Sequence, residues 1–286
     1  MSNSENREIS ICKNLAEVFI DTDAHIKVAK IICDHLVNFQ DIRSIALEKV
    51  DFSKVRNILD LGCGFGYFTH GLKDKVHPDA NITGIDCHSK YKQLYLNACS
   101  EAGIHGKFMG DGISIIESFK PKSVDLILCS YALYFFPGYI EQIARVLKDD
   151  GTFLVITHAL PHMNEFTQYV KDILFNAGIK CREPLPYESL IRGFSNENGN
   201  ELLSSSFIEV DNIHYTGRLL FNHNDIESFR DYFRFKRLFF IPCKETDIDD
   251  MSAIILERMK NDLKRLKKFE ISKNDIIYIC KGTRNN

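Results

Sequence analysis

Short apolar runs alternate with amphipathic segments through the middle of this chain. Each apolar run is expected to form a buried strand. These runs lie at residues 55–61, 81–85, 107–109, 123–130 and 152–157. Helical spacing of apolar residues occupies the segments at 89–102, 137–147 and 163–177. Because the runs are continuously apolar, the strands should be covered on both faces, and the alternation predicts an α/β fold with a doubly wound parallel sheet.

The two flanks of this region follow other patterns. A helix is expected at residues 9–20, and Asp21-Thr22-Asp23 should end it and cap a second helix that reaches Val37. A stop at Asp149-Asp150-Gly151 should precede the fifth strand. Beyond residue 177 the expected elements are a polar surface loop at 191–206, a strand or bent strand pair at 207–221, helices at 226–240 and 247–268, and a strand at 275–280.

Three glycines at alternate positions follow the first strand, in Gly62-Cys63-Gly64-Phe65-Gly66. A helix is expected to start at Tyr67, so backbone N–H groups and a helix N-terminus should meet at this turn. The pyrophosphate fingerprint needs a glycine where Tyr67 stands, and the Gly-Lys-Ser/Thr of a P-loop is absent. Asp60 stands just before the turn instead.

Asp60 followed by GxGxG resembles motif I of the class I S-adenosylmethionine (SAM) methyltransferases. SAM carries an ammonium and a sulfonium and no phosphate, so an acidic residue beside the turn suits it. The resemblance implies a Rossmann-like, doubly wound seven-stranded sheet with its last strand antiparallel. It also implies three parts: an N-terminal helical cap (1–50), a SAM-binding core (51–160), and a C-terminal part of the same domain with substrate-pocket helices (161–286). N-terminal helices and a helical insertion would roof the site.

Several residues are expected to contact the cofactor. Asp86, at the end of the second strand, should accept hydrogen bonds from the ribose hydroxyls; the alternative is a helix N-cap. Cys87 would lie against the adenine, and by resemblance Asp111 would accept a bond from its amino group, unless it is an ordinary turn aspartate. The other cofactor-binding candidates are Asp60, Gly62, Cys63, Gly64, Gly66, Gly112 and Ser130.

The acceptor should sit at the carboxyl ends of the fourth and fifth strands. The run from Ser130 to Tyr134 resembles motif IV of the family, but aromatic residues replace the histidine pair of many relatives. His158 follows the fifth strand and could act as general base, or could be a hydrogen-bonded structural residue. Tyr134 would orient the acceptor, and Tyr131 and His25 would bind it. The alternative for His25 is a solvent-exposed or capping role.

Composition narrows the function classes. The net charge is −3, which argues against a chain that coats nucleic acid, and the basic run at 258–268 is expected to be a solvated helix face. The nine cysteines contain no CxxC pair, so no metal site is expected. No apolar run is long enough to span a bilayer and no signal core is seen, so no membrane partner and a cytoplasmic location are expected.

The resulting hypothesis is an enzyme that moves the methyl group of SAM to an oxygen or nitrogen of a small molecule and releases S-adenosylhomocysteine. The alternatives are a tRNA or protein methyltransferase and a SAM-binding regulatory protein without transfer activity. The acids near the glycine turn do not separate these alternatives, because all of them bind SAM. The sequence leaves the acceptor and the oligomeric state open.

Overall fold

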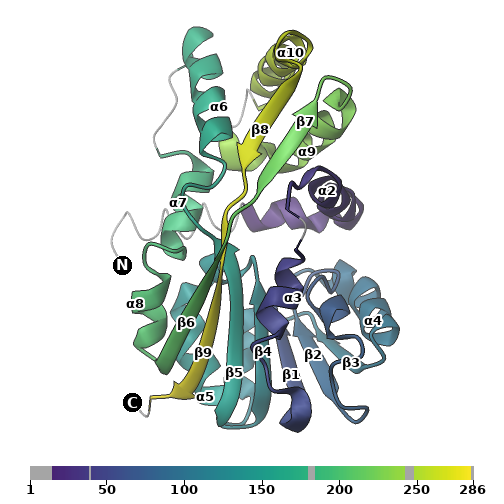
Figure 1. Cartoon of the computed structure of the whole chain (residues 1–286), viewed down its shortest axis with the longest axis vertical. Helices are drawn as coiled ribbons and strands as arrows, with labels where there is room; N and C mark the ends of the chain where they lie inside the picture. The colour runs from purple at the N-terminus through teal and green to yellow at the C-terminus, as the bar shows by residue number, and fades with distance from the viewer. Residues whose placement is uncertain (1–14, 39, 180–183, 242–247, 285–286) are drawn as a thin grey trace. The chain divides into compact units, whose positions relative to one another are not determined.

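A computed structural model describes residues 15–38, 40–179, 184–241 and 248–284 (Figure 1). The chain forms two compact units. The sheet unit comprises Phe39–Leu160, Gly193–Tyr215 and Asp275–Asn286. The helical unit comprises Met1–Asn38, Pro161–Arg192 and Thr216–Asn274.

A seven-stranded sheet forms the centre of the sheet unit, in the order β3-β2-β1-β4-β5-β9-β6 (Figure 1). Its strands are β1 (Asn57–Leu61), β2 (Asn81–Ile85), β3 (His105–Met109), β4 (Val124–Ser130), β5 (Leu147–His158), β6 (Phe207–Tyr215) and β9 (Asp275–Thr283). Strands β1 to β5 pair in parallel, and β9 lies antiparallel between β5 and β6. The predicted Rossmann-like sheet with its last strand antiparallel is therefore confirmed.

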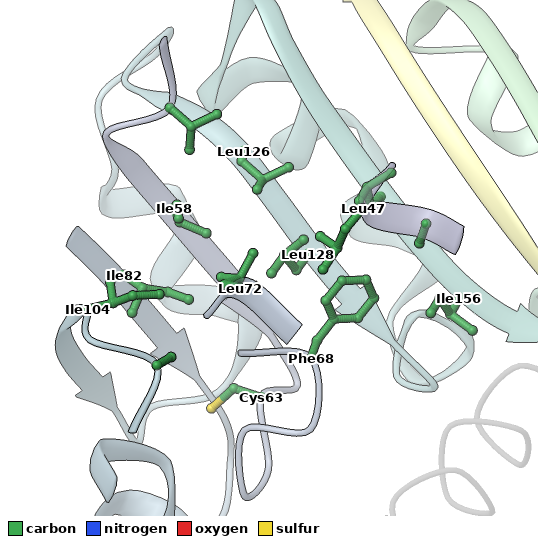
Figure 2. Packing of buried hydrophobic residues seen from close by; sticks show 14 of the residues in the cluster. Leu47, Ile58, Cys63, Phe68, Leu72, Ile82, Ile104, Leu126, Leu128 and Ile156 are labelled. Carbon is green, nitrogen blue, oxygen red and sulfur yellow. The ribbon is translucent and has the colours of Figure 1, made fainter. Parts of the chain in front are cut away.

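Alternate side chains of these strands pack on opposite faces of the sheet. Figure 2 shows residues of the core cluster on one face, among them Ile58, Ile82 and Leu128 of the strands, together with Leu47 and Phe68. The helices and 3₁₀ turns of the sheet unit are α3 (Ile42–Leu47), η2 (Phe52–Lys54), η3 (Thr69–Leu72), η4 (Ser89–Tyr91), α4 (Lys92–Glu101), η5 (Ile113–Ser118), η6 (Leu133–Phe135), η7 (Pro137–Tyr139), α5 (Ile140–Val146) and α8 (Gly199–Ser204).

The structure corrects three expectations in this unit. The helix predicted from Tyr67 is only the short turn η3. The predicted stop at Asp149-Asp150-Gly151 lies inside β5, where the pairing with β4 is irregular. The predicted loop at 191–206 contains α8 and buries Phe194, because Asn side chains bond its backbone: Asn198 Oδ1 accepts the N–H of Ser195.

The helical unit contains η1 (Glu17–Ile20), α2 (Thr22–His35), α6 (Asn164–Asn176), α7 (Pro186–Gly193), β7 (Arg218–Asn222), α9 (Ile226–Phe240), α10 (Ile248–Leu266) and β8 (Lys268–Ser272). Asp21 caps α2 as expected, by accepting the N–H of Ala24. The predicted strand pair at 207–221 divides between units: β6 joins the main sheet, whereas β7 pairs with β8, a strand the pattern did not predict. Most of the helix expected at 9–20 lies outside the described residues.

The basic run at 258–268 is partly neutralised within α10. Asp262 accepts hydrogen bonds from Arg258 and Arg265, and both arginine side chains are largely exposed. This agrees with a solvated helix face. In the described parts of the chain, no helix combines the length and apolar character needed to cross a bilayer.

Candidate functional site

The carboxyl ends of the parallel strands share one edge of the sheet. There β1 ends at Leu61, β2 at Ile85, β4 at Ser130 and β5 at His158. Because β9 is antiparallel, its first residue, Asp275, lies at this same edge, directly opposite His158. This is the edge at which open α/β sheets bind their ligands.

The glycine turn lies at this edge in a conformation that side chains rarely adopt. Gly62, Gly64 and Gly66 have φ angles of 65°, 47° and 86°. A Cβ on Gly62 would stand 2.4 Å from the Cβ of Ala132, and one on Gly66 would stand 2.5 Å from the Cβ of Ala98. Gly62 and Gly66 are therefore required both by backbone conformation and by close packing.

Replacing Gly66 with alanine should destabilise the fold more than replacing Gly103. Both glycines have positive φ, but a Cβ on Gly103 would meet nothing within 4 Å. Gly103→Ala should therefore lower the free energy of unfolding by about 1 kcal/mol, because alanine disfavours the left-handed conformation. Gly66→Ala should lower it by about 1–3 kcal/mol more, because the new Cβ also overlaps its neighbour. Urea unfolding of the two variants measures the difference. Equal destabilisation would show that the contact with Ala98 is relieved at little cost.

Asp60 is buried beneath the turn, with 1% of its surface exposed. The hydroxyl of Thr69 donates to its Oδ2 at 2.8 Å. Burial, opposed by the Thr69 hydrogen bond and assisted by the neighbouring Asp86 charge, raises the pKa of this carboxyl to about 7. A positive charge bound next to Asp60 would therefore stabilise the ionised form of this carboxyl.

Asp86 closes the turn from the end of β2. Its Oδ2 accepts the N–H of Gly64 at 2.9 Å, and its Oδ1 accepts the N–H of His88 at 2.9 Å. The bond to His88 is the local, cap-like role that was the alternative for this residue, and the bond to Gly64 fixes the carboxylate against the turn. Each carboxylate oxygen can accept a second bond, so ribose hydroxyls can still be bound. Burial raises the pKa of Asp86 despite these bonds.

The remaining cofactor candidates divide into two groups. Cys63 points its side chain into the hydrophobic core, so only its backbone faces the turn (Figure 2). Cys87 and Asp111 are exposed, and a Cβ on Gly112 would lie 3.6 Å from the Cβ of Cys87. The loops after β2 and β3 thus come together beside Asp86, where adenine contacts were expected.

Tyr131, Tyr134 and His158 form a second cluster on the same edge. The His158 ring lies 5.2 Å from that of Tyr131 and stacks on that of Tyr134 at 5.6 Å, measured between centroids. Burial raises the pKa of both tyrosines well above its ordinary value, so both phenols stay protonated at neutral pH. Tyr131 also has a positive φ of 54°, a strained conformation of the kind found at functional sites.

Asp275 joins this cluster and was not among the predicted site residues. It has 1% of its surface exposed, accepts the Tyr131 hydroxyl on Oδ2 at 2.9 Å, and places Oδ1 3.1 Å from Nδ1 of His158. No local motif marks it, because it simply begins the apolar run of β9. The available signal was the predicted antiparallel last strand, which brings its first residue to the ligand edge.

His25, the other predicted acceptor residue, lies on α2 in the helical unit. Its ring stacks on Phe235 at 5.5 Å and meets the edge of Phe19 at 4.9 Å. Burial, with the charge of Lys236, lowers its pKa to about 4, so it is neutral at physiological pH. This is neither the solvent-exposed nor the capping role. Its place in an acceptor pocket, and the roofing of the site by α2 and α9, stay predictions.

Comparison with known proteins agrees with this geometry. Residues 52–181 match the family model described as "Methyltransferase domain". The matched stretch contains the glycine turn and His158. Crystal structures with the same fold include YcgJ of Bacillus subtilis (TM-score 0.54, 18% identity, covering 85% of this chain and 98% of that one). A second is a Bacillus halodurans protein assigned to the methyltransferases (TM-score 0.52, 12% identity, covering 83% and 97%).

The curated relatives match half of this chain or less. The uncharacterised methyltransferase YcgJ of Bacillus subtilis is 27% identical over 119 residues, covering 40% of this chain and 46% of the relative. The demethylmenaquinone methyltransferase of Listeria monocytogenes is 23% identical over 146 residues, covering 50% and 60%. The chain thus spans about half the length of the curated relatives it matches.

The residues at the turn fit SAM, the cofactor of this family. Among the described residues neither Asp60 nor Asp86 forms an ion pair, so their charge is available to a cationic ligand. The glycine backbone approaches without side chains, and no lysine or arginine stands in the turn to bind a phosphate. Asp86 would hold the ribose, and Asp60 would favour the positive charge.

Proposed function

We propose that this chain is a SAM-dependent methyltransferase acting on an oxygen or nitrogen of a small molecule. One observation carries the proposal: the glycine turn, with the carboxyl groups of Asp60 and Asp86, and the cluster around His158 occupy the same edge of one sheet. A binding site for the cofactor and a group able to accept a proton are thereby brought together in the sheet unit.

SAM, when bound, supplies a methyl group already activated by its sulfonium. The chain's own residues then have to bind, orient and exclude water, and to take up a proton where the acceptor carries one. Transfer would form a bond from the acceptor's oxygen or nitrogen to the methyl carbon and would leave the electrons of the carbon–sulfur bond on sulfur. The acceptor's proton passes to Nε2 of His158 and from there to solvent.

Tyr131 and Tyr134 complete the acceptor side in this proposal. Both stay neutral, so they can orient an acceptor through ring contacts or hydroxyl groups but cannot act as bases. His158 is left as the member of the cluster whose ring nitrogen can accept a proton from the acceptor.

Two observations favour a small molecule over tRNA or protein as the acceptor: the net charge of the chain and its similarity to a methyltransferase named for a small molecule. The net charge is −3, and arginines of the basic run in α10 are paired with Asp262. One relative is named for a quinone substrate, demethylmenaquinone. A regulatory protein that binds SAM without transfer is the second candidate, and turnover separates it from the enzyme.

The test has two steps. Calorimetry with S-adenosylhomocysteine measures cofactor binding to the whole chain. A screen of small hydroxyl and amine acceptors with isotope-labelled SAM then measures transfer. Binding with transfer supports the enzyme, binding without transfer to any acceptor, tRNA or protein supports the regulatory candidate, and absence of binding contradicts both.

Asp86→Ala should weaken S-adenosylhomocysteine binding by about 1.5–3 kcal/mol, because hydrogen bonds to a charged acceptor are lost. The variant also frees the N–H groups of Gly64 and His88, so thermal unfolding should accompany calorimetry. Asp150→Ala is the matched control, since this exposed aspartate lies within β5 and away from the turn. Unchanged affinity in folded Asp86→Ala would remove Asp86 from the ribose role.

A further inference from the structure

We propose that Asp275 is a positioning residue that fixes the tautomer and orientation of the His158 ring for proton transfer. The assignment rests on the proposed function, in which His158 accepts the acceptor's proton. Asp275 lies near the C-terminal end of the sequence. It reaches the site because β9 runs antiparallel between β5 and β6.

The hydrogen bonds define the tautomer. An ionised carboxylate accepts hydrogen bonds and donates none, so the 3.1 Å contact between Asp275 Oδ1 and His158 Nδ1 requires a proton on Nδ1. The lone pair of the neutral ring is then on Nε2, the nitrogen that has to receive the proton. Without such a partner, either nitrogen can carry the proton, and the ring can turn about its side-chain bonds.

Tyr131 holds the carboxylate itself in place. Its hydroxyl donates to Oδ2 at 2.9 Å, so each oxygen of Asp275 has a donor. Hydrogen-bond donors stabilise the charged form of a buried carboxyl, and Asp275 has one at each oxygen. When His158 takes up a proton, the same carboxylate faces the resulting imidazolium, and the positive charge is compensated inside the site.

The register leaves little freedom in this arrangement. Asp275 is paired across the sheet with His158 on one side and with Tyr215 on the other. The Tyr131 backbone is held by its N–H bond to the carbonyl of Ile156 at 2.8 Å. Three strands therefore set the positions of the three side chains, as expected where a reactive group has to be pre-organised.

The experiment is proton-detected ¹⁵N spectroscopy of the histidine rings in the whole chain at pH 8, with His158 assigned from the signal lost in His158→Gln. Wild type should show His158 in the Nδ1–H tautomer. Asp275→Asn, which keeps shape and removes charge, should raise the Nε2–H population several-fold. Tyr131→Phe, the control, leaves the carboxylate next to Nδ1 and should keep the Nδ1–H tautomer.

Two spectroscopic results would overturn the assignment: a wild-type ring in the Nε2–H form, or an unchanged tautomer in an Asp275→Asn variant that thermal unfolding shows to be folded. With an acceptor from the screen, Asp275→Asn should slow turnover at least about tenfold, and adding it to His158→Ala should slow turnover no further, since both act through one ring. Additive losses would contradict the assignment. If S-adenosylhomocysteine binds but no acceptor is methylated, the proposed function fails while the spectra still decide the tautomer.

Discussion

Replacing His158 with alanine should slow methyl transfer by roughly 10²–10⁴-fold at saturating SAM, the range typical for loss of a general base. The ring is 8% exposed and stacked on Tyr134, and it faces the buried carboxylate of Asp275. Its removal takes away the proton acceptor without touching the glycine turn. Affinity for S-adenosylhomocysteine should therefore stay close to that of wild type, and stopped or continuous transfer assays measure the rate.

Two further variants make this result interpretable. His105→Ala removes an exposed histidine from the start of β3, at the opposite edge of the same sheet, and should leave turnover unchanged. Tyr134→Phe keeps the ring stacked on His158 and removes only the hydroxyl, so its effect isolates orientation of the acceptor. Near wild-type turnover in both His158→Ala and Tyr134→Phe would place the chemistry elsewhere, and His25 would be the next residue to replace.

The local parts of the site could be predicted because one short stretch of sequence builds them. Asp60, the three glycines and Asp86 lie at strand ends whose apolar runs are unambiguous, and a positive φ at Gly62, Gly64 and Gly66 is what alternate glycines permit. The edge of the sheet was also predictable, because parallel strands joined by helices place their carboxyl ends together. His158 followed from that rule alone.

The features that the sequence did not predict depend on contacts between segments that are distant in the sequence. Asp275 acquires its role from strand register across 117 residues of sequence. Strand β8 has only five residues, and Lys268 and Glu270 make it look polar, although β7 pairs with it along its whole length. The polar Asn and Ser side chains of the segment at 191–206 predict a surface loop. In the structure such side chains form hydrogen bonds with backbone groups: Asn196 Oδ1 accepts the N–H of Leu160.

The contribution of Asp60 to the stability of the chain without cofactor should fall as pH rises from about 4 to 7, and Asp60→Asn should remove this contribution. The folded pKa of Asp60 is raised to about 7 from an ordinary 3.8, so between these values the folded state holds a proton that the unfolded state has lost. Ionising the buried carboxyl then costs about 4 kcal/mol over the whole window. The amide oxygen in Asp60→Asn would still accept the Thr69 hydroxyl bond, but the side chain would carry no charge.

Because other groups also make stability depend on pH, the effect of Asp60 has to be measured as the difference between wild type and Asp60→Asn. Asp86, whose pKa is also raised by burial, adds a dependence of the same sign. His25, whose pKa is lowered to about 4, has the opposite effect, since the unfolded state binds its proton below about pH 6.5 and stability rises with pH across that range. Urea unfolding of wild type and Asp60→Asn should therefore be compared at each pH. Parallel stability curves would contradict the raised pKa.

The same carboxyl should couple cofactor binding to proton release. A cationic ligand beside Asp60 favours its ionised form, so binding SAM at pH 6, where most Asp60 carboxyls are protonated, should release up to about one proton. Calorimetry in two buffers of different ionisation enthalpy measures this number. Asp60→Asn should bind with little release, while Asp150→Ala should behave as wild type. Proton release of equal size in wild type and Asp60→Asn would assign the titration to another group and leave Asp60 a structural acid.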